Sequence, residues 1–323
     1  MSGPGKKGVV IVTGVDLAPE AVAILHDYEL VYAGAKPSED DLVRLSQQHQ
    51  PVGIIVRYGG VTGRVMDASP ALRVISKHGT GIDTIDSQAA QARGIAVKAA
   101  AGANAPAVAE HTWALVMACA KNVVGLDARM RQGHWDKSTH KSLELQGRTI
   151  GLVGFGAIGR RVAATAVSLG MQVLAYDPFA KEAPAGVQLA DLETLFERAD
   201  VLSLHCPLTA ENRHMINAAS LARMKDGAIL VNTARGGLID EQALIAALAS
   251  GKLRAAGLDS FEKEPFAVPH PLQDVANVIL SPHIGGVTED AYIAMGTGAA
   301  GNVLAVLEAQ TAQTTQATQA VPA

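Results

Sequence analysis

Short apolar segments rich in Val, Ile and Leu recur along the chain, and polar or amphipathic segments separate them. The apolar segments predict strands, and some of the segments between them carry helix-starting residues such as Pro19 and Ser38. We predict strands at 9–13, 52–56, 72–76, 149–153, 171–177, 199–204, 228–232, 253–258 and 278–280. Strands that alternate with helices are typical of mostly parallel sheets covered on both faces. The pattern therefore predicts an α/β protein.

One interruption divides this alternation into two series. Residues 99–106, AAAGANAP, are small and glycine-bearing, and they indicate a boundary or hinge. A long helix is expected from about 107 to 120, with a second helix through 132, and a last helix at 288–308. The tail that follows has low complexity, so we expect residues 309–323 to be disordered.

Composition and charge limit the possible functions. The chain has 323 residues, 48% hydrophobic and 18% charged, which suits about two domains with sizeable cores. A net charge of −4 argues against nucleic acid or an anionic membrane as the main partner. No apolar run reaches the roughly 20 residues of a membrane helix, and no signal peptide is recognisable. Cys119 and Cys206 form no disulfide framework, so we expect a reducing cytoplasm.

A glycine-rich turn follows the predicted strand at 149–153. In GFGAIG, Gly154 permits a tight turn, Gly156 lets a pyrophosphate approach the backbone, and Gly159 lets the next helix sit close to the sheet. Asp177 ends the next strand, at the spacing expected for a carboxylate that bonds a ribose hydroxyl. No arginine follows it at 178–179 to hold a 2′-phosphate, so NAD is favoured over NADP. The alternative interpretation is a glycine turn without a ligand.

Ionisable residues follow three later strands, where ligands bind in open α/β sheets. Arg235 follows one strand, Asp259 and Glu264 the next, and His283 the last. Singly, each has a plain alternative: a surface charge, a solvated loop residue or a capping histidine. Together they suit reduction of a 2-oxo acid, because an imidazole can protonate the carbonyl oxygen, a carboxylate can orient the imidazole, and a guanidinium can hold the substrate carboxylate.

Several motifs together resemble one enzyme family. GFGAIG, HCPLT, NTARGGLIDEQAL, GLDSFEKEP and SPHIGG, with HGTGIDTID and VAEHT in the first half, are similar to the D-isomer-specific 2-hydroxyacid dehydrogenases. The resemblance covers the chain to about residue 308. It implies two Rossmann-like, doubly wound parallel-sheet domains, the smaller one built from both chain ends. We therefore expect a flavodoxin-like substrate-binding domain at 1–101 and 289–308 and an NAD-binding domain at 102–288.

The same resemblance implies roles for individual residues. Arg235 is expected to anchor the substrate carboxylate, His283 to be the acid/base, and Glu264 to be its partner. The residues expected to line NAD, besides those of the glycine turn and Asp177, are Thr80, Ala157, Ile158, Cys206, Thr233, Ala234, Asp259, Gly285 and Gly286. No metal is expected: there is no H-E-x-x-H, and Glu110 and His111 are adjacent and so point to different faces of a helix.

The segment VRYGG…KHGTGID most resembles the phosphoglycerate dehydrogenase branch of the family, without that branch's C-terminal regulatory domain. There, an arginine at the position of Arg57 contacts the charged end of the substrate; the alternative is a solvated strand-end charge. Tyr58, Gly59 and Gly60 replace a small hydroxyl-bearing stretch, and His78 stands where the branch has alanine. We expect these residues to bind substrate, with 3-phosphoglycerate, hydroxypyruvate and glyoxylate as candidates.

Two further hypotheses concern partners. The segment 133–137, GHWDK, matches one that packs across a dimer in this family, whereas the alternative for Trp135 is the core of its own chain. With the alanine-rich helix from 107, this segment predicts a homodimer. The alternative function is an NAD(H)-sensing regulator like the corepressors that share this fold, which would bind protein partners instead of turning over a small-molecule substrate.

Overall fold

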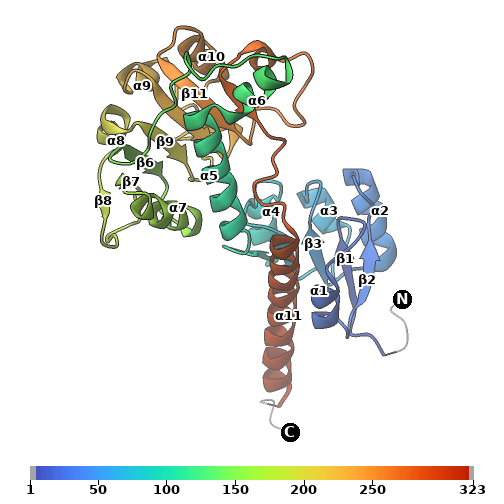
Figure 1. The fold of residues 1–323 in the computed structure, drawn as a ribbon. Helices are drawn as coiled ribbons and strands as arrows, with labels where there is room; N and C mark the ends of the chain where they lie inside the picture. Colours follow the sequence, from blue (N-terminus) through green and yellow to red (C-terminus); the bar gives the residue numbers. More distant parts are fainter. Residues whose placement is uncertain (1–4, 320–323) are drawn as a thin grey trace. The chain divides into compact units, whose positions relative to one another are not determined.

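The computed structural model describes residues 5–319, which separate into two compact units. The first unit contains the described residues up to Asn104 and from Val287 onwards, and the second is Ala105–Gly286 (Figure 1). From the sequence, the boundaries between the two domains are predicted at 101/102 and 288/289, in the same two loops. Both ends of the chain thus contribute to one unit, and the middle of the chain forms the other.

A parallel sheet forms the centre of the first unit, with strand order β2-β1-β3-β4-β5. Its strands are β1 Val9–Val12, β2 Glu29–Tyr32, β3 Gly53–Val56, β4 Val74–Lys77 and β5 Ala96–Ala99. Side chains alternate between the faces, so Val10 packs with α1 (Pro19–Ile24) and α11 (Glu289–Gln319), whereas Ile11 packs with α2 (Glu39–His49) and α3 (Gly63–Asp67). The short helix α4 (Ser87–Ala92) also lies on the second face.

The last helix, α11, shows why both chain ends are needed for this unit. It packs on β3 and β4 so closely that a Cβ at Gly53 would lie 3.2 Å from Val303 Cγ1. The prediction of a disordered tail from 309 is wrong for residues 309–319, which continue this helix, while residues 320–323 lie outside the described part of the chain. Alanine and glutamine favour helix, and no proline interrupts the segment before Pro322.

The second unit is built on a larger parallel sheet of order β12-β11-β10-β9-β6-β7-β8. Its strands are β6 Thr149–Val153, β7 Gln172–Tyr176, β8 Val187–Leu189, β9 Val201–Leu204, β10 Ala228–Asn232, β11 Leu253–Leu258 and β12 Val278–Leu280. The chain runs outward from β6 through β7 to β8, then returns to β9 and runs to β12 on the other side. The order therefore reverses between β6 and β9, and ligands bind at such a reversal, beyond the carboxyl ends of the strands.

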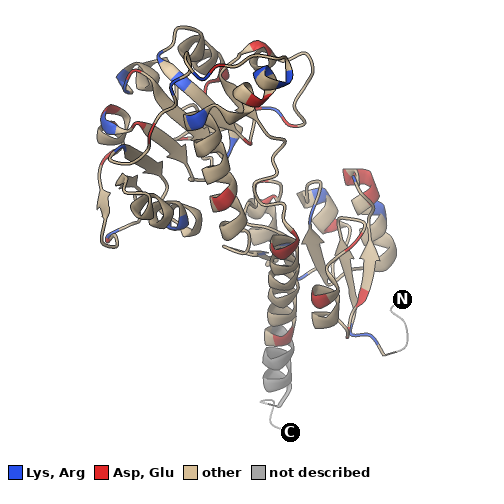
Figure 2. Ribbon diagram, viewed as in Figure 1, with Lys and Arg blue, Asp and Glu red and all other residues tan. Residues whose placement is uncertain are grey.

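Helices cover both faces of the second sheet. One face packs against α5 (Ala105–Lys121) and α7 (Ala157–Ser168), the other against α8 (Leu192–Arg198), α9 (Ala218–Arg223) and α10 (Glu241–Ala249). Two short 3₁₀ turns, Gly236–Leu238 and Pro271–Asp274, lie in the loops after β10 and β11. Charged residues lie mainly on helices and loops, and the central strands carry few of them, as expected for parallel strands buried on both faces (Figure 2).

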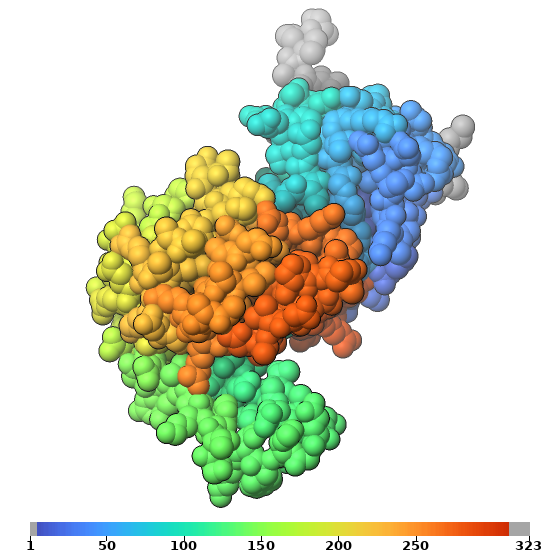
Figure 3. Space-filling model, turned by 90° about the horizontal axis from the view of Figure 1, so that it is seen from above, coloured from blue at the N-terminus to red at the C-terminus, as the bar shows by residue number. Residues whose placement is uncertain are grey.

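The segment around α6 (Val123–Arg131) projects from the second unit (green in Figure 3). It exposes large apolar side chains: Val123, Val124, Met130 and Trp135. Trp135 is 73% exposed, so the interpretation of this residue as part of its own chain's core is wrong. These exposed apolar side chains could contact a second copy of the chain, and the homodimer stays a prediction.

Candidate active site

The glycine turn lies at the reversal of strand order and has the space that a dinucleotide needs. Gly154 has φ +100°, and a Cβ there would lie 2.7 Å from the carbonyl carbon of His205, at the end of β9. A Cβ on Gly159 would lie 2.2 Å from the Gly154 oxygen, so only glycine lets α7 start this close to the turn. Around the Cβ direction of Gly156 no described atom lies within 4 Å. The residues therefore fit a pyrophosphate at the start of α7, over Ala157 and Ile158.

Asp177 is held beside this turn at the end of β7. Its carboxylate accepts hydrogen bonds from the amides of Phe155 and Phe179, both at 2.8 Å. These bonds fix the side chain next to the glycine turn and leave carboxylate lone pairs for ribose hydroxyls. Asp177 and the glycine turn together would hold the ADP half of NAD.

The residues after β9 and β10 form the next part of the same sheet edge. Burial raises the pKa of the Cys206 thiol to about 11, so it is protonated at neutral pH and is not a nucleophile. Thr233 is buried, and its hydroxyl bonds that of Thr112 on α5 at 2.9 Å. The amide of Ala234 donates to Asn232 Oδ1 at 3.0 Å. These contacts tie the end of β10 to α5 and set the direction in which the chain leaves the strand.

Arg235 follows directly and is half-buried. Asn232 Nδ2 donates to its carbonyl oxygen at 2.9 Å, and its own guanidinium donates to the Ala234 carbonyl at 2.8 Å. The next residue, Gly236, packs against the backbone after β11, where a Cβ would lie 1.8 Å from the carbonyl carbon of Phe261. The Arg235 loop and the loop that carries Glu264 are therefore in direct contact.

His283 and Glu264 form a pair beyond the ends of β11 and β12. His283 Nδ1 lies 2.7 Å from Glu264 Oε2, and the Phe261 amide donates to Glu264 Oε1 at 3.0 Å. The histidine side chain is 46% exposed and the glutamate 36%, so the pair is open to solvent within its unit. Glu264 is thus fixed at one oxygen and orients the imidazole with the other. In the described part of the chain, Nε2 of His283 has no hydrogen-bond partner, which leaves this nitrogen available to a substrate.

A buried network of Asp259, Ser281 and His111 supports the His283 loop. Asp259 is among the residues named from the sequence, whereas Ser281 and His111 are given no role there. Asp259 is 2% exposed, and its carboxylate accepts from the Ile284 amide at 2.9 Å, the Gly285 amide at 2.7 Å and the Ser281 hydroxyl at 2.7 Å. His111 Nε2 lies 2.9 Å from Ser281 Oγ and 3.3 Å from Asp259 Oδ1.

This network holds a loop in an uncommon conformation. His283 has φ +56°, and the two residues after it are those whose amides Asp259 binds. A Cβ on Gly285 would lie 2.9 Å from Asp259 Oδ2, so a larger residue would have to displace this buried carboxylate, and Gly286 ends the unit. The sequence held one signal for this network: Ser281 and Asp259 each come one residue after a strand, and the two strands, β12 and β11, are neighbours.

The remaining candidate residues lie in the first unit. The Thr13 hydroxyl accepts from the amides of Arg57 and Tyr58 at 3.0 and 3.2 Å, which fixes the turn after β3. Gly59 continues this turn with φ +71°, and Gly60 packs against the Thr84 carbonyl. Two others follow β4: His78 is buried, with its ring 5.5 Å from that of Tyr292, and the Thr80 hydroxyl donates to Asn104 Oδ1 at 3.0 Å.

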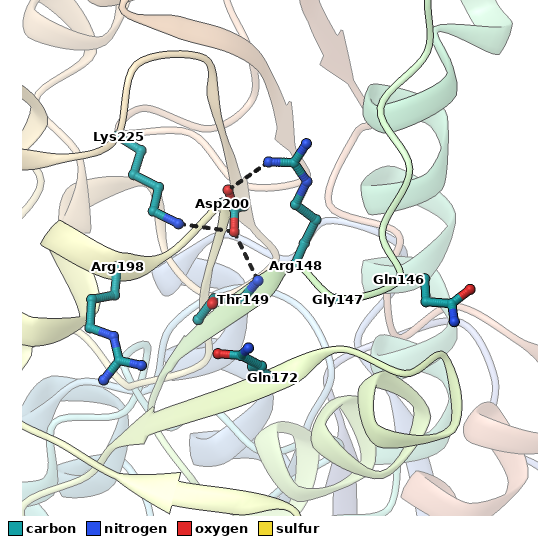
Figure 4. A pocket seen from close by; sticks show the side chains of 8 residues that line it. All are labelled: Gln146, Gly147, Arg148, Thr149, Gln172, Arg198, Asp200 and Lys225. Atoms are coloured by element: carbon teal, nitrogen blue, oxygen red, sulfur yellow. Dashed lines mark hydrogen bonds and ion pairs between the residues drawn. The ribbon is translucent and has the colours of Figure 1, made fainter.

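A polar pocket also exists at the opposite edge of the second sheet, before β6, β7 and β9 (Figure 4). Asp200 lies in it and accepts from the Thr149 amide at 2.9 Å, Lys225 Nζ at 3.1 Å and Arg148 Nη1 at 3.4 Å. Burial acts to raise the pKa of Asp200, but the bonds from Thr149 and Lys225 and the charge of Arg148 together lower it below its usual value. The aspartate joins loops at the amino ends of the strands, away from the edge that carries the glycine turn.

Within residues 5–319, His, Cys, Asp and Glu side chains form no group of three or more that is arranged to hold a metal ion. In the same range, the helices fall short of the length and apolar character required to cross a membrane.

Known proteins of similar sequence cover most of this chain. The family model for the NAD-binding domain of D-isomer specific 2-hydroxyacid dehydrogenases matches residues 113–285. A hydroxypyruvate reductase of Thermotoga maritima is 42% identical over 275 residues, which cover 84% of this chain and 90% of that protein. A D-3-phosphoglycerate dehydrogenase of Methanocaldococcus jannaschii is 40% identical over 299 residues, or 91% of this chain and 56% of that protein. The chain thus spans about half the length of that dehydrogenase.

Solved structures show the same likeness. The D-lactate dehydrogenase of Aquifex aeolicus, complexed with NAD and lactic acid, aligns with a TM-score of 0.82 at 29% identity, over 94% of this chain and 97% of that one. With the two parallel sheets and the dinucleotide turn, this likeness indicates an NAD-dependent oxidoreductase. The chain belongs to the D-isomer-specific 2-hydroxyacid dehydrogenase family. The predictions of fold class, family and NAD as cofactor are therefore confirmed.

Proposed function

We propose that this enzyme interconverts a small anionic 2-oxo acid and its D-2-hydroxy acid, with His283, Glu264 and Arg235 as the residues that act on the substrate. The observation that carries the proposal is the 2.7 Å contact between His283 Nδ1 and Glu264 Oε2, because the loop of Glu264 also contacts the Arg235 loop through Gly236. A family relative of 42% identity that is a hydroxypyruvate reductase supports the substrate class.

Each residue has one task in the reduction. NADH, when bound, supplies the hydride that reaches the carbonyl carbon. His283 donates a proton from Nε2 to the carbonyl oxygen, where negative charge grows, and takes it back in the oxidation. Glu264 keeps the imidazole oriented and balances its positive charge. Arg235 binds the substrate carboxylate through two parallel hydrogen bonds and so fixes the position of the carbonyl group.

The test is NADH oxidation with hydroxypyruvate, glyoxylate, pyruvate and the 2-oxo acid of 3-phosphoglycerate. His283→Asn should lower kcat by about 10²–10⁴ while leaving the affinity for NADH within a few-fold, because the loss is of proton transfer. Arg235→Ala should raise KM and lower kcat together. Glu264→Gln should change the pH profile and retain measurable turnover.

His26→Asn is the matched control, because this histidine side chain is 75% exposed and belongs neither to the candidate site nor to the proposed dimer surface. It should behave as the wild type. Equal turnover in His283→Asn would remove that residue from the chemistry. A folded wild-type protein that binds NADH and turns over none of the acids would support the alternative of an NAD(H)-sensing regulator.

We also propose that the enzyme is a homodimer that uses the apolar surface around α6, since Val123, Val124 and Trp135 are exposed there. Light scattering should give twice the chain mass, and Trp135→Asp should lower it. A reducing cytoplasm is our proposal for its location, supported by Cys119 and Cys206, both of which are free thiols.

A further inference from the structure

The Arg57 guanidinium, which the family resemblance assigns to the charged end of the substrate, already has an anionic partner within its own unit. Its side chain is 11% exposed, and Nη1 donates to the Asp16 carbonyl oxygen at 2.6 Å and also to the Asp16 carboxylate. The absence of a side chain on Gly14 makes room for it, since a Cβ there would lie 3.1 Å from Arg57 Cδ. Arg57 is therefore held in place by the loop that follows β1.

The Asp16 carboxylate is ionised at neutral pH. The hydrogen bond from Arg57 lowers the pKa of Asp16, outweighing the smaller opposing effect of its burial. The negative charge of Asp16 consequently offsets the positive charge of Arg57 at the point where a substrate anion would be bound.

The other groups around Arg57 add little compensating positive charge. The guanidinium carbon lies 4.9 Å from the centre of the Tyr292 ring and 5.4 Å from that of Tyr58, which are neutral partners. Burial lowers the pKa of His78 to about 4, and the positive charge of Arg57 contributes to this, so the imidazole is neutral at pH 7. Lys77 is the exception, and its ammonium donates to the Arg57 carbonyl oxygen at 3.2 Å.

We propose that Asp16 determines substrate specificity: by pairing with Arg57 it disfavours a phosphorylated 2-oxo acid and favours one whose only charge is its carboxylate. This inference rests on the proposed function, because it takes Arg57 to lie at the end of the substrate remote from that carboxylate. A phosphate dianion meets both the paired Arg57 and the repulsion of Asp16, whereas a hydroxyl group can donate to the Asp16 carboxylate and lie against Tyr58. The class of substrate is thus hydroxypyruvate or a similarly small, unphosphorylated acid.

The experiment compares kcat/KM for hydroxypyruvate and for 3-phosphohydroxypyruvate, each with NADH. The wild type should favour hydroxypyruvate by at least about tenfold. Asp16→Asn and Asp16→Ala should each shift the ratio of the two kcat/KM values toward the phosphorylated acid by about tenfold or more, since Arg57 then faces the phosphate without a competing carboxylate. The shift should shrink as ionic strength rises.

Asp40→Asn is the matched control, because Asp40 is an exposed carboxylate of the same unit that pairs with Arg64 at 2.7 Å. It should leave the ratio within about twofold, as expected for a surface ion pair. A wild type that prefers the phosphorylated acid would overturn the proposal, and so would an unchanged ratio in the Asp16 variants. Even if a variant does not fold, the wild-type ratio alone shows whether the enzyme prefers the unphosphorylated acid. Absence of turnover with either acid would instead refute the proposed function itself.

Discussion

The carboxylate of Asp259 gives the most direct test of how the His283 loop is held. Asp259→Asn keeps the size and shape of the side chain but replaces one acceptor oxygen with an NH₂ donor. In the wild type, Oδ1 accepts from Ser281 Oγ and the Ile284 amide, and Oδ2 accepts from the Gly285 amide. Whichever way the new amide group turns, its NH₂ faces at least one backbone N–H.

The size of the effect follows from these contacts. A hydrogen bond to a charged group contributes about 1.5–3 kcal/mol, and a buried donor left without a partner costs about 1–3 kcal/mol. Because the side chain is 2% exposed, water does not replace the lost bond. We expect Asp259→Asn to lower the free energy of unfolding of the second unit by about 3 kcal/mol. For a unit of this size, that lowers its Tm by roughly 6–12 °C.

Turnover should fall further than stability alone would predict. The two amides that Asp259 binds belong to the residues after His283, so their release moves the imidazole away from its working position. A displacement of this kind costs about 10²-fold in kcat. Thermal unfolding followed by circular dichroism, together with NADH oxidation at a temperature where the variant is folded, measures both quantities.

The matched control is Asp226→Asn, in the same unit. That side chain is 90% exposed and pairs with Lys252 at 2.7 Å, so its replacement should change the Tm by no more than about 2 °C. If Asp259→Asn had the Tm and kcat of the wild type, Asp259 would not be what holds the His283 loop, and the reasoning would fail.

Three further predictions concern separate features. Gly236→Ala should lower kcat and Tm, since its Cβ would lie 1.8 Å from the Phe261 carbonyl carbon, whereas Gly301→Ala, with open space around it, should be neutral or slightly stabilising in the same assays. Burial lowers the pKa of His78 to about 4, so the unfolded state takes up its proton first as pH falls, and stability should be lost from about pH 6.5 toward pH 4. Denaturant titrations should show that the wild type loses up to about 3 kcal/mol of unfolding free energy over this range and that His78→Gln does not. The same pH dependence in both proteins would contradict the account. Asp177→Ala should reduce the preference for NADH over NADPH in kcat/KM by about tenfold or more, and an unaltered preference would remove this carboxylate from ribose recognition.

The buried strands could be predicted from the sequence because central strands of parallel sheets must be apolar on both faces. The strands that were missed are β2, β5 and β8, which lie at the edges of their sheets and are only partly buried. An edge strand needs no continuous apolar run, so segments such as AVKA at 96–99 leave little local signal. The short helices α3 and α4 were missed because they have too few turns to show a periodic pattern.

Part of the candidate site could likewise be predicted from the sequence, and part could not. The glycine turn and Asp177 are close in the sequence, and their spacing carries the meaning. His111 and Ser281 are 170 residues apart, and their 2.9 Å contact depends on the packing of α5 beside β11 and β12. Likewise, Asp16 meets Arg57 only because β1 and β3 are neighbours in the sheet.

The sequence by itself determined the α/β class, the two domains, the NAD turn and the family, because each depends on local periodicity or on short motifs whose geometry one turn of chain decides. It also indicated that Arg235, Glu264 and His283 follow neighbouring strands. Only the tertiary structure decided which of these residues touch, that a buried Asp259 network holds the His283 loop, and that Arg57 is already paired with Asp16. Such contacts arise from strand order and helix packing, which bring together residues that no local pattern links.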